Sequence, residues 1–114
     1  MKKGRRDKYT SYVGIDRKAV FRCESWRHLS LRAKLFYIHL KAHFDGTNNG
    51  TIQLHFSELS SHPGFNSKRA FYGAAKELVS AGWITRTNPD RRSGLHRNPN
   101  TYRLTGKFDG YAIE

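Results

Sequence analysis

The stretch from Phe56 to Trp83 constrains the fold more than any other part of the chain, because it combines two helix signals with a breaker between them. Ser57 is a suitable N-cap for a first short helix that runs through Ser61. His62-Pro63-Gly64 then ends that helix, since proline cannot continue it and glycine accepts backbone angles that other residues avoid. The pattern therefore predicts a short helix followed by a tight turn.

A second, longer helix is expected directly after the turn. Asn66-Ser67 can start this helix, which runs from about Lys68 to Ala81, and Gly82 ends it. The residues expected to face the core, because they recur at helical spacing, are Phe71, Ala74, Leu78 and Val79, with Ala70 and Ala75. Two helices joined by a glycine-containing turn form the helix-turn-helix layout, whose second helix usually enters the major groove of DNA.

The chain carries a large positive charge on a length suited to one domain. Its 114 residues include 21 Lys plus Arg against 9 Asp plus Glu, a formal net charge of +12. Such an excess repels itself in a compact protein and is usually kept for binding nucleic acid or an anionic membrane. No apolar run approaches the roughly 18 residues that span a bilayer, and the basic start lacks the apolar segment of a secretory signal. We therefore expect a cytoplasmic, nucleoid-associated protein without a membrane partner.

Two further helices are expected before this motif. Asp16 can cap a helix from Arg17 to about His28, and Ser30 can cap a longer helix that begins at Leu31. The residues expected on the buried face of the first are Ala19, Val20, Cys23 and Trp26. On the second, the apolar stripe is Leu31, Leu35, Ile38 and Ala42, widened by Ala33, Phe36, Tyr37 and Leu40.

Short strands are expected around the motif, which makes the fold α+β. Thr51-Ile52-Gln53-Leu54 alternates after a turn at Asp45–Gly50. Trp83–Thr87 and Tyr102–Thr105 are β-prone and flank a polar loop rich in Pro and Gly, so we expect a β-hairpin with a basic loop. The aromatic residues assigned to the core are Phe21, Trp26, Phe36, Tyr37, Phe44, Phe56, Phe71 and Trp83, whereas Tyr72 and Tyr102 are expected to be exposed.

Several segments resemble winged-helix proteins of bacterial replication and of phage or mobile-element regulation. The segments that carry the resemblance are Leu29-Ser30, Ala33, Leu35-Phe36-Tyr37, Asn49-Gly50-Thr51-Ile52, Phe56-Ser57-Glu58-Leu59, Glu77–Ile84 and Tyr102-Arg103-Leu104-Thr105. The resemblance covers about Val13 to Thr105, and the Pro of the turn, Pro63, departs from many relatives. It implies a winged-helix domain, which we place at residues 9–107. The run of Lys and Arg before it predicts a disordered basic arm at 1–8, and residues 108–114 are expected to form a C-terminal tail.

The residues that would contact DNA follow from which face of the second helix is apolar. If Phe71, Ala74 and Leu78 face the core, the expected contacts of the recognition helix are Asn66, Ser67, Lys68, Arg69, Tyr72, Gly73 and Lys76. The expected contacts of the wing, to phosphates or the minor groove, are Arg86, Arg91, Arg92, His96 and Arg97. Those of the arm are Lys2, Lys3, Arg5, Arg6 and Lys8. The alternative for each set is a solvated charged surface without a contact.

Catalytic and metal chemistry have little support in the sequence. His39 and His43 are four residues apart on the long helix, but no third ligand follows at a suitable spacing. Cys23 is the single cysteine, which excludes an internal disulfide and a multi-cysteine zinc site. No nucleophile motif, phosphate loop or close carboxylate pair is present. We therefore expect no catalytic residues, no metal, no cofactor and no small-molecule substrate.

The sequence thus favours a non-catalytic protein that binds double-stranded DNA, in transcription regulation or replication control. Two alternatives stay open: a winged-helix module for protein interaction within a larger assembly, and a binder of structured RNA. The segment Phe108–Ile113 is a candidate contact for a homodimer.

Overall fold

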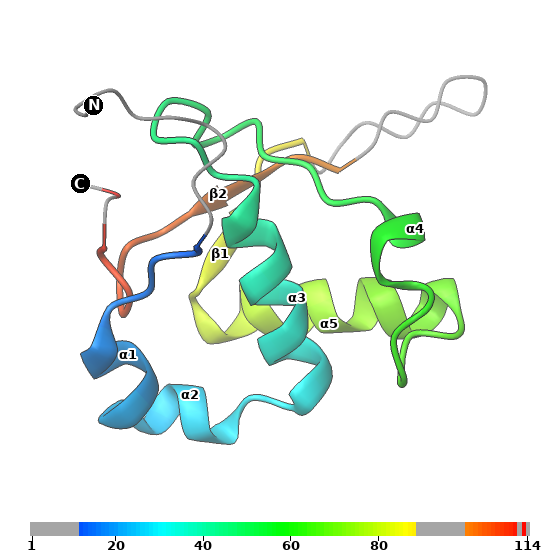
Figure 1. Ribbon diagram of the computed structural model, residues 1–114, viewed down its shortest axis with the longest axis horizontal. Coiled ribbons are helices and arrows are strands. Elements are labelled where there is room, and N and C mark those ends of the chain that lie inside the picture. Colours follow the sequence, from blue (N-terminus) through cyan, green and yellow to red (C-terminus); the bar gives the residue numbers. More distant parts are fainter. Residues whose placement is uncertain (1–11, 89–99, 112, 114) are drawn as a thin grey trace.

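Helices make up the first two thirds of the fold and a small sheet follows them (Figure 1). The computed structural model describes residues 12–88, 100–111 and 113. Within them the elements are α1 (Arg17–Phe21), α2 (Glu24–His28), α3 (Leu31–Ala42), α4 (Phe56–Leu59), α5 (Lys68–Ala81), β1 (Ile84–Arg86) and β2 (Tyr102–Leu104). The fold is therefore α+β, as predicted.

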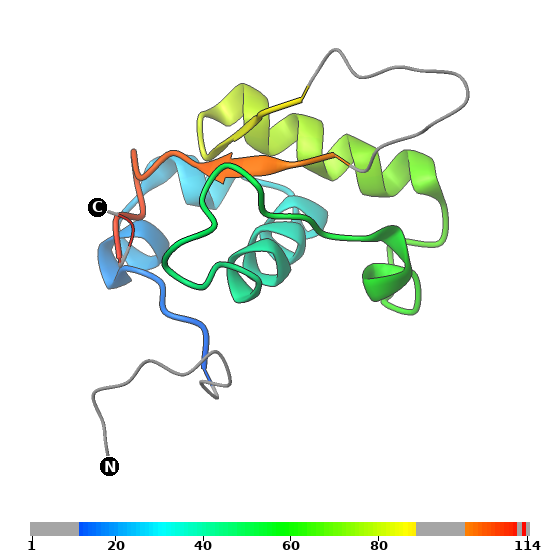
Figure 2. The same ribbon diagram turned by 90° about the horizontal axis from the view of Figure 1, so that it is seen from above.

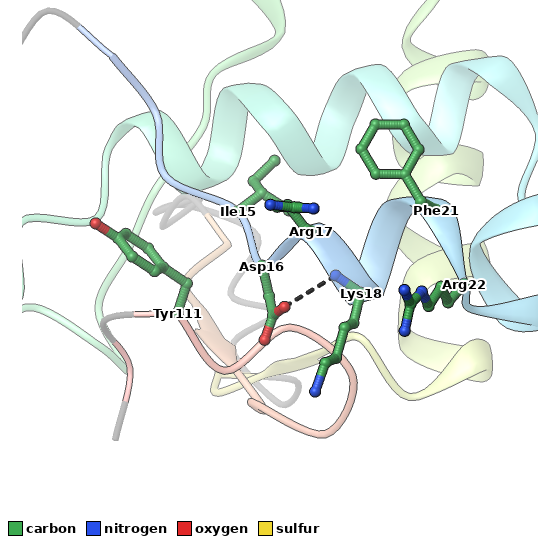
Figure 3. Close-up of a pocket in the computed structure, with 7 residues that line it drawn as sticks. All are labelled: Ile15, Asp16, Arg17, Lys18, Phe21, Arg22 and Tyr111. Carbon is green, nitrogen blue, oxygen red and sulfur yellow. Dashed lines mark hydrogen bonds between the residues drawn. The ribbon is translucent and has the colours of Figure 1, made fainter.

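The first helical region is broken in two, so the prediction of one helix from Arg17 to His28 is wrong. Asp16 does cap α1, because its Oδ1 accepts the N–H of Lys18 at 2.9 Å (Figure 3). The chain then leaves the helix, and Cys23 has extended angles of φ −104° and ψ 120°. Such short segments have little helical stability of their own, so side-chain packing decides their direction. The break buries Trp26 but leaves Phe21 72% exposed, so the assignment of Phe21 to the core is also wrong.

The buried face of α3 is set by its two aromatic residues rather than by the predicted stripe. Ser30 caps the helix as expected, since its Oγ accepts the N–H of Ala33 at 3.1 Å. The buried residues are Ala33, Phe36, Tyr37, Leu40 and Lys41, whereas Leu31 and Ala42 are exposed and Leu35 and Ile38 are half-buried. Large rings remove more apolar area from water than leucine does, so they determine how the helix turns.

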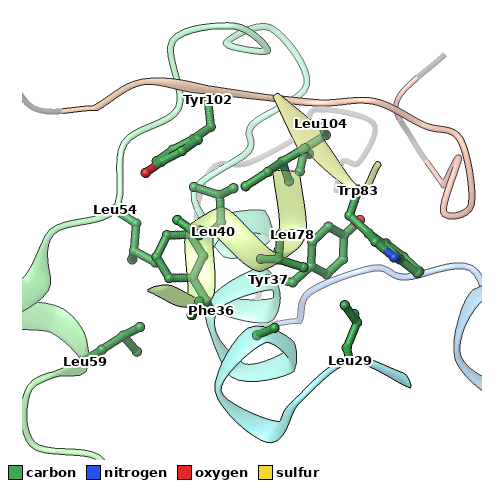
Figure 4. Packing of buried hydrophobic residues seen from close by; sticks show 14 of the residues in the cluster. Leu29, Phe36, Tyr37, Leu40, Leu54, Leu59, Leu78, Trp83, Tyr102 and Leu104 are labelled. Atoms are coloured by element: carbon green, nitrogen blue, oxygen red, sulfur yellow. The ribbon is translucent and has the colours of Figure 1, made fainter. Parts of the chain in front are cut away.

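The core joins α3, α5 and the sheet through aromatic contacts (Figure 4). The ring of Phe36 lies 5.1 Å from that of Phe71 on α5 and 5.9 Å from that of Tyr102 on β2, measured between centroids. Leu78 of α5 is fully buried in the same cluster. These contacts hold the inner face of α5 against α3.

A second aromatic group surrounds Trp83, directly after α5. Its ring centroid lies 5.3 Å from Trp26, 5.3 Å from Tyr37 and 4.7 Å from Phe108. Its Nε1 donates to Ser25 Oγ at 3.0 Å, so the indole N–H is satisfied although the ring is buried. The group ties α2, α3 and the segment after β2 to the end of α5.

The sheet has the predicted antiparallel pair and one reduced strand. β1 and β2 pair with Ile84 opposite Leu104, and the predicted strand at 51–54 is limited to a single bridge between Ile52 and Tyr102. Tyr102 therefore hydrogen-bonds to Ile52 while it also faces β1, and its side chain is buried. The prediction that Tyr102 is exposed is wrong because the residue lies between two extended segments.

The segment after β2 packs on the domain through a buried carboxylate, Asp109. Its Oδ2 accepts from Lys41 Nζ at 2.8 Å and from the Tyr37 hydroxyl at 2.5 Å, and its Oδ1 accepts from the backbone N–H of Asp16 at 2.8 Å. Burial raises the pKa of the Tyr37 phenol far above its usual range, and the hydrogen bond to Asp109 raises it further. One acid therefore connects α1, α3 and the segment after β2.

Replacing Asp109 with alanine should lower the free energy of unfolding by about 3–5 kcal/mol, because Lys41 would stay buried without its counter-charge. The measurement is urea unfolding followed by circular dichroism. The matched control is Glu24→Ala, which removes the exposed pair of Glu24 with Arg27 and should change stability by less than about 1 kcal/mol. Equal effects of the two substitutions would contradict the role assigned to Asp109.

Candidate nucleic-acid interface

The helix α5 has the bounds that the sequence predicts, and both of its ends are capped. Ser67 Oγ accepts the N–H of Ala70 at 3.2 Å at the start. Gly82 has φ 88° at the end, a left-handed conformation that glycine adopts without strain, and its N–H bonds back to Val79. Local signals alone therefore fix the length and position of this helix.

One face of α5 is buried and the other is open to solvent. The buried residues are Phe71, Ala74, Ala75 and Leu78, and the exposed ones include Lys68, Arg69, Tyr72, Gly73 and Lys76. Val79 is exposed although the sequence placed it inward, because Leu78 fills the contact with the core. Figure 2 shows α5 along one edge of the molecule, with α3 and α4 on its inner side. The basic and aromatic face predicted for this helix is thus exposed to solvent.

Gly73 lies in the middle of the exposed face, and no neighbour among the described residues requires a glycine there. A Cβ added there would meet no heavy atom within 4 Å. Close packing against the described part of the core therefore does not explain a glycine at this position. The residue leaves a low point on the outer face of α5.

The start of α4 is held against the end of α3 by the carboxylate of Glu58. It begins after His55, not with Ser57 as its cap, so that prediction is wrong. Glu58 explains the change, since its Oε2 accepts the N–H of His55 at 3.4 Å and its Oε1 lies 2.6 Å from Nε2 of His43, the residue after α3. The backbone start of α4 is therefore satisfied by Glu58 and fixed to α3.

The turn between α4 and α5 is anchored by one buried ring. Phe65 is fully buried, whereas Pro63 is exposed and Gly64 has φ 93°. A Cβ on Gly64 would lie 3.4 Å from Arg32 Nε, so the turn passes close to the start of α3. The ring of Phe56 on α4 also lies 5.6 Å from that of Phe71, which sets the distance between the two helices.

Arg32 is a basic residue at this surface that the sequence reasoning did not select. It lines a recess of about 540 Å³ between the starts of α3 and α5, together with Asn66, Ser67 and Arg69. Glu77 also lines the recess, but its carboxylate accepts from the N–H of Ser30 at 2.8 Å and from the Ser30 hydroxyl at 2.7 Å. No sequence spacing connects positions 32 and 69, because only the packing of α3 on α5 brings them together.

The strand side of the surface is described in part. Arg86 is half-buried, its Nη2 donates to the carbonyl of Asn88 at 3.3 Å, and its Nε is buried without a hydrogen-bond partner among the described residues. Arg86 is paired with Tyr102 in the register of β1 and β2. Burial raises the pKa of the Tyr102 phenol, while the hydrogen bond from Asn100 and the charge of Arg86 act in the opposite direction. The predicted contacts outside the described residues are Arg91, Arg92, His96 and Arg97 of the wing and Lys2, Lys3, Arg5, Arg6 and Lys8 of the arm.

The described residues offer no metal centre or membrane span. No group of three or more His, Cys, Asp or Glu side chains in this part of the chain could hold a metal ion. His39, half of the pair considered above, packs its ring 5.2 Å from that of His62, while His43 contacts Glu58. None of the helices in the described ranges is long and apolar enough to cross a bilayer.

Comparison with known proteins does not identify a relative of this chain. Compared with known proteins, the chain matches no family model, no curated protein and no solved structure. What the described residues provide is a solvent-facing basic helix, a recess lined by Arg32 and Arg69, and an arginine, Arg86, at the end of β1.

Stability should fall as the pH drops below about 6.5, because burial and the nearby His62 lower the pKa of His39 in the folded protein. Below that pH the unfolded chain takes up a proton on His39 that the folded protein disfavours. The stability that His39 contributes is therefore complete above the ordinary histidine pKa and is lost as the pH falls below it. The measurement is the urea midpoint between about pH 7.5 and 5.5.

The substitution His39→Gln removes the titrating ring and should reduce that loss. His62→Gln removes only the neighbouring charge, so it should reduce the loss in part. Parallel curves for the wild type and His39→Gln would show that another group causes the pH dependence.

Proposed function

We propose that the protein binds double-stranded DNA without catalysis, with α5 as the recognition helix in the major groove. In this proposal α4, the turn at 60–67 and α5 form a helix-turn-helix, and β1 and β2 form the base of a wing. The fold is then a winged helix, and its role is transcription regulation or replication control. The observation that carries the proposal is the amphipathic division of α5, with Lys68, Arg69, Tyr72 and Lys76 all on the side open to solvent.

The chemistry of that face suits a duplex. Arginine can form a bidentate pair with guanine, which typically supplies about 1–3 kcal/mol of discrimination. Arg69 and Lys68 lie in the first turn of α5, the part of a recognition helix that usually reaches base edges. The low point at Gly73 allows a close approach of the groove wall to the helix backbone.

Groups beside α5 would bind the phosphates that flank the groove. The recess next to the helix start has two guanidinium groups, from Arg32 and Arg69, and its acid, Glu77, is bound by Ser30. Phosphate contacts of this kind fix the register of a protein on DNA. Arg86 and the basic residues of the wing and the arm would extend the same positive surface.

The charge favours nucleic acid over the protein-interaction alternative. A net charge of +12 on 114 residues exceeds what a protein contact needs and resists the approach of a second basic molecule. Binding that relies on phosphates releases counterions, so affinity should fall steeply as salt rises.

Arg69→Gln should weaken binding to duplex DNA, measured by fluorescence anisotropy over a salt series. If Arg69 pairs with a base, the loss should be about 1–3 kcal/mol at the preferred sequence and small elsewhere. If it contacts a phosphate, the loss should be uniform across sequences, with a salt slope lower by about one.

The matched control is Arg27→Gln, which removes an exposed arginine of α2 outside this surface. Its duplex affinity should equal that of the wild type. Absence of duplex binding at low salt, or tighter binding to duplex RNA than to duplex DNA, would reject the proposal. Selection of bound fragments from a random DNA pool would then identify the preferred site.

A further inference from the structure

A second basic recess lies at the other end of the molecule. Figures 1 and 2 both place α1 and the segment after β2 at the end opposite to α4 and the start of α5. The recess there has a volume of about 650 Å³ and lies between α1 and Tyr111 (Figure 3). The duplex-binding surface proposed above does not include any of its residues.

Phe21 gives this recess an exposed ring that the core does not use. It is the last residue of α1 and is 72% exposed, although a phenylalanine usually gains by burial. The break after α1 produces this position, because it turns Trp26 inward and leaves Phe21 on the outside. A single exposed ring is common on protein surfaces, so the case for a binding site here rests on its combination with a second ring and several cations.

Tyr111 is the second ring, and it is fixed in place from behind. A Cβ on Gly14 would overlap the Tyr111 ring, so the ring lies directly on the backbone of that glycine. The Tyr111 carbonyl accepts from Lys41 Nζ at 3.1 Å, and the same ammonium lies 5.7 Å from the ring centroid. The side chain is still 50% exposed, so it offers a held, half-open aromatic face.

Three exposed cations, Arg17, Lys18 and Arg22, lie between and beside these rings (Figure 3). The acid of the recess, Asp16, is engaged by the N–H of Lys18, and its own N–H is bound by Asp109. The backbone donors at the start of α1 are thus partly used within the protein. Attraction for a ligand must therefore come from the side chains.

We infer that this recess binds single-stranded nucleic acid, with a base stacked on Phe21 and phosphates on the neighbouring cations. Exposed rings combined with a basic groove are the features of single-strand binding, because every base has a face that can stack. A second copy of the chain is a poor occupant, since a symmetric contact would place the same cations against each other. The inference does not depend on the duplex-binding proposal, because the two surfaces lie at opposite ends.

The test compares the full-length protein with oligothymidylate and with an abasic oligonucleotide of the same length, by fluorescence anisotropy. The two probes carry the same phosphates, so their difference reports contacts to bases. The wild type should bind oligothymidylate at least about fivefold more tightly than the abasic strand, and Phe21→Ala should remove this preference. The control Leu31→Ala, which removes an exposed leucine outside the recess, should keep it.

A direct reading comes from Phe21→Trp. The natural tryptophans, Trp26 and Trp83, are buried, so quenching of the new indole by oligothymidylate would report stacking at position 21. Equal affinity for the abasic strand, no effect of Phe21→Ala, no quenching, or equally effective competition by polyglutamate would each overturn the inference. The last result would indicate an acidic protein segment instead.

The two surfaces can be separated with charge variants. Arg22→Gln should weaken oligothymidylate binding and leave duplex binding unchanged, whereas Lys76→Gln should do the reverse. If the wild type does not bind duplex DNA but keeps its preference for oligothymidylate over the abasic strand, the proposed function alone is rejected. Loss of the base preference with normal duplex binding would reject the second site alone.

Discussion

The contact between Phe36 of α3 and Phe71 of α5 determines which groups the molecule presents to solvent. With centroids 5.1 Å apart, the two rings commit one side of α5 to the core. Helical geometry then leaves Lys68, Arg69 and Lys76 no position except on the other side. The outer chemistry of the helix is thus a consequence of an apolar contact that no ligand would touch.

The features that the sequence predicted well are those specified by neighbouring residues. Ser67 and Gly82 each cap α5 by bonding to a residue at most four positions away in the sequence. The helix could therefore be placed without knowledge of the rest of the fold. The pairing of β1 with β2 was also predictable, because both segments are β-prone and flank a breaker-rich loop. The α+β class followed from these elements.

Several of the errors concern residues whose environment is made by distant segments. Tyr102 is buried because Ile52, fifty positions earlier, hydrogen-bonds to it. Phe21 is exposed because Trp26 packs against Tyr37 and Trp83, which breaks the first helix. Arg32 lies beside Arg69 because α3 packs on α5, and no local sequence pattern predicts that the two residues line one recess. A single sequence without tertiary information could not have placed these side chains.

The buried pair of Lys41 with Asp109 also has a consequence for the order in which the chain becomes structured. Helix α3 is synthesised long before residue 109, so its ammonium has no counter-charge while the intervening segments leave the ribosome. Until then, insertion of Lys41 into the apolar interior is unfavourable, and the hydroxyl of Tyr37 lacks its acceptor. We therefore expect α3 to reach its final packing only after the segment after β2 has been made.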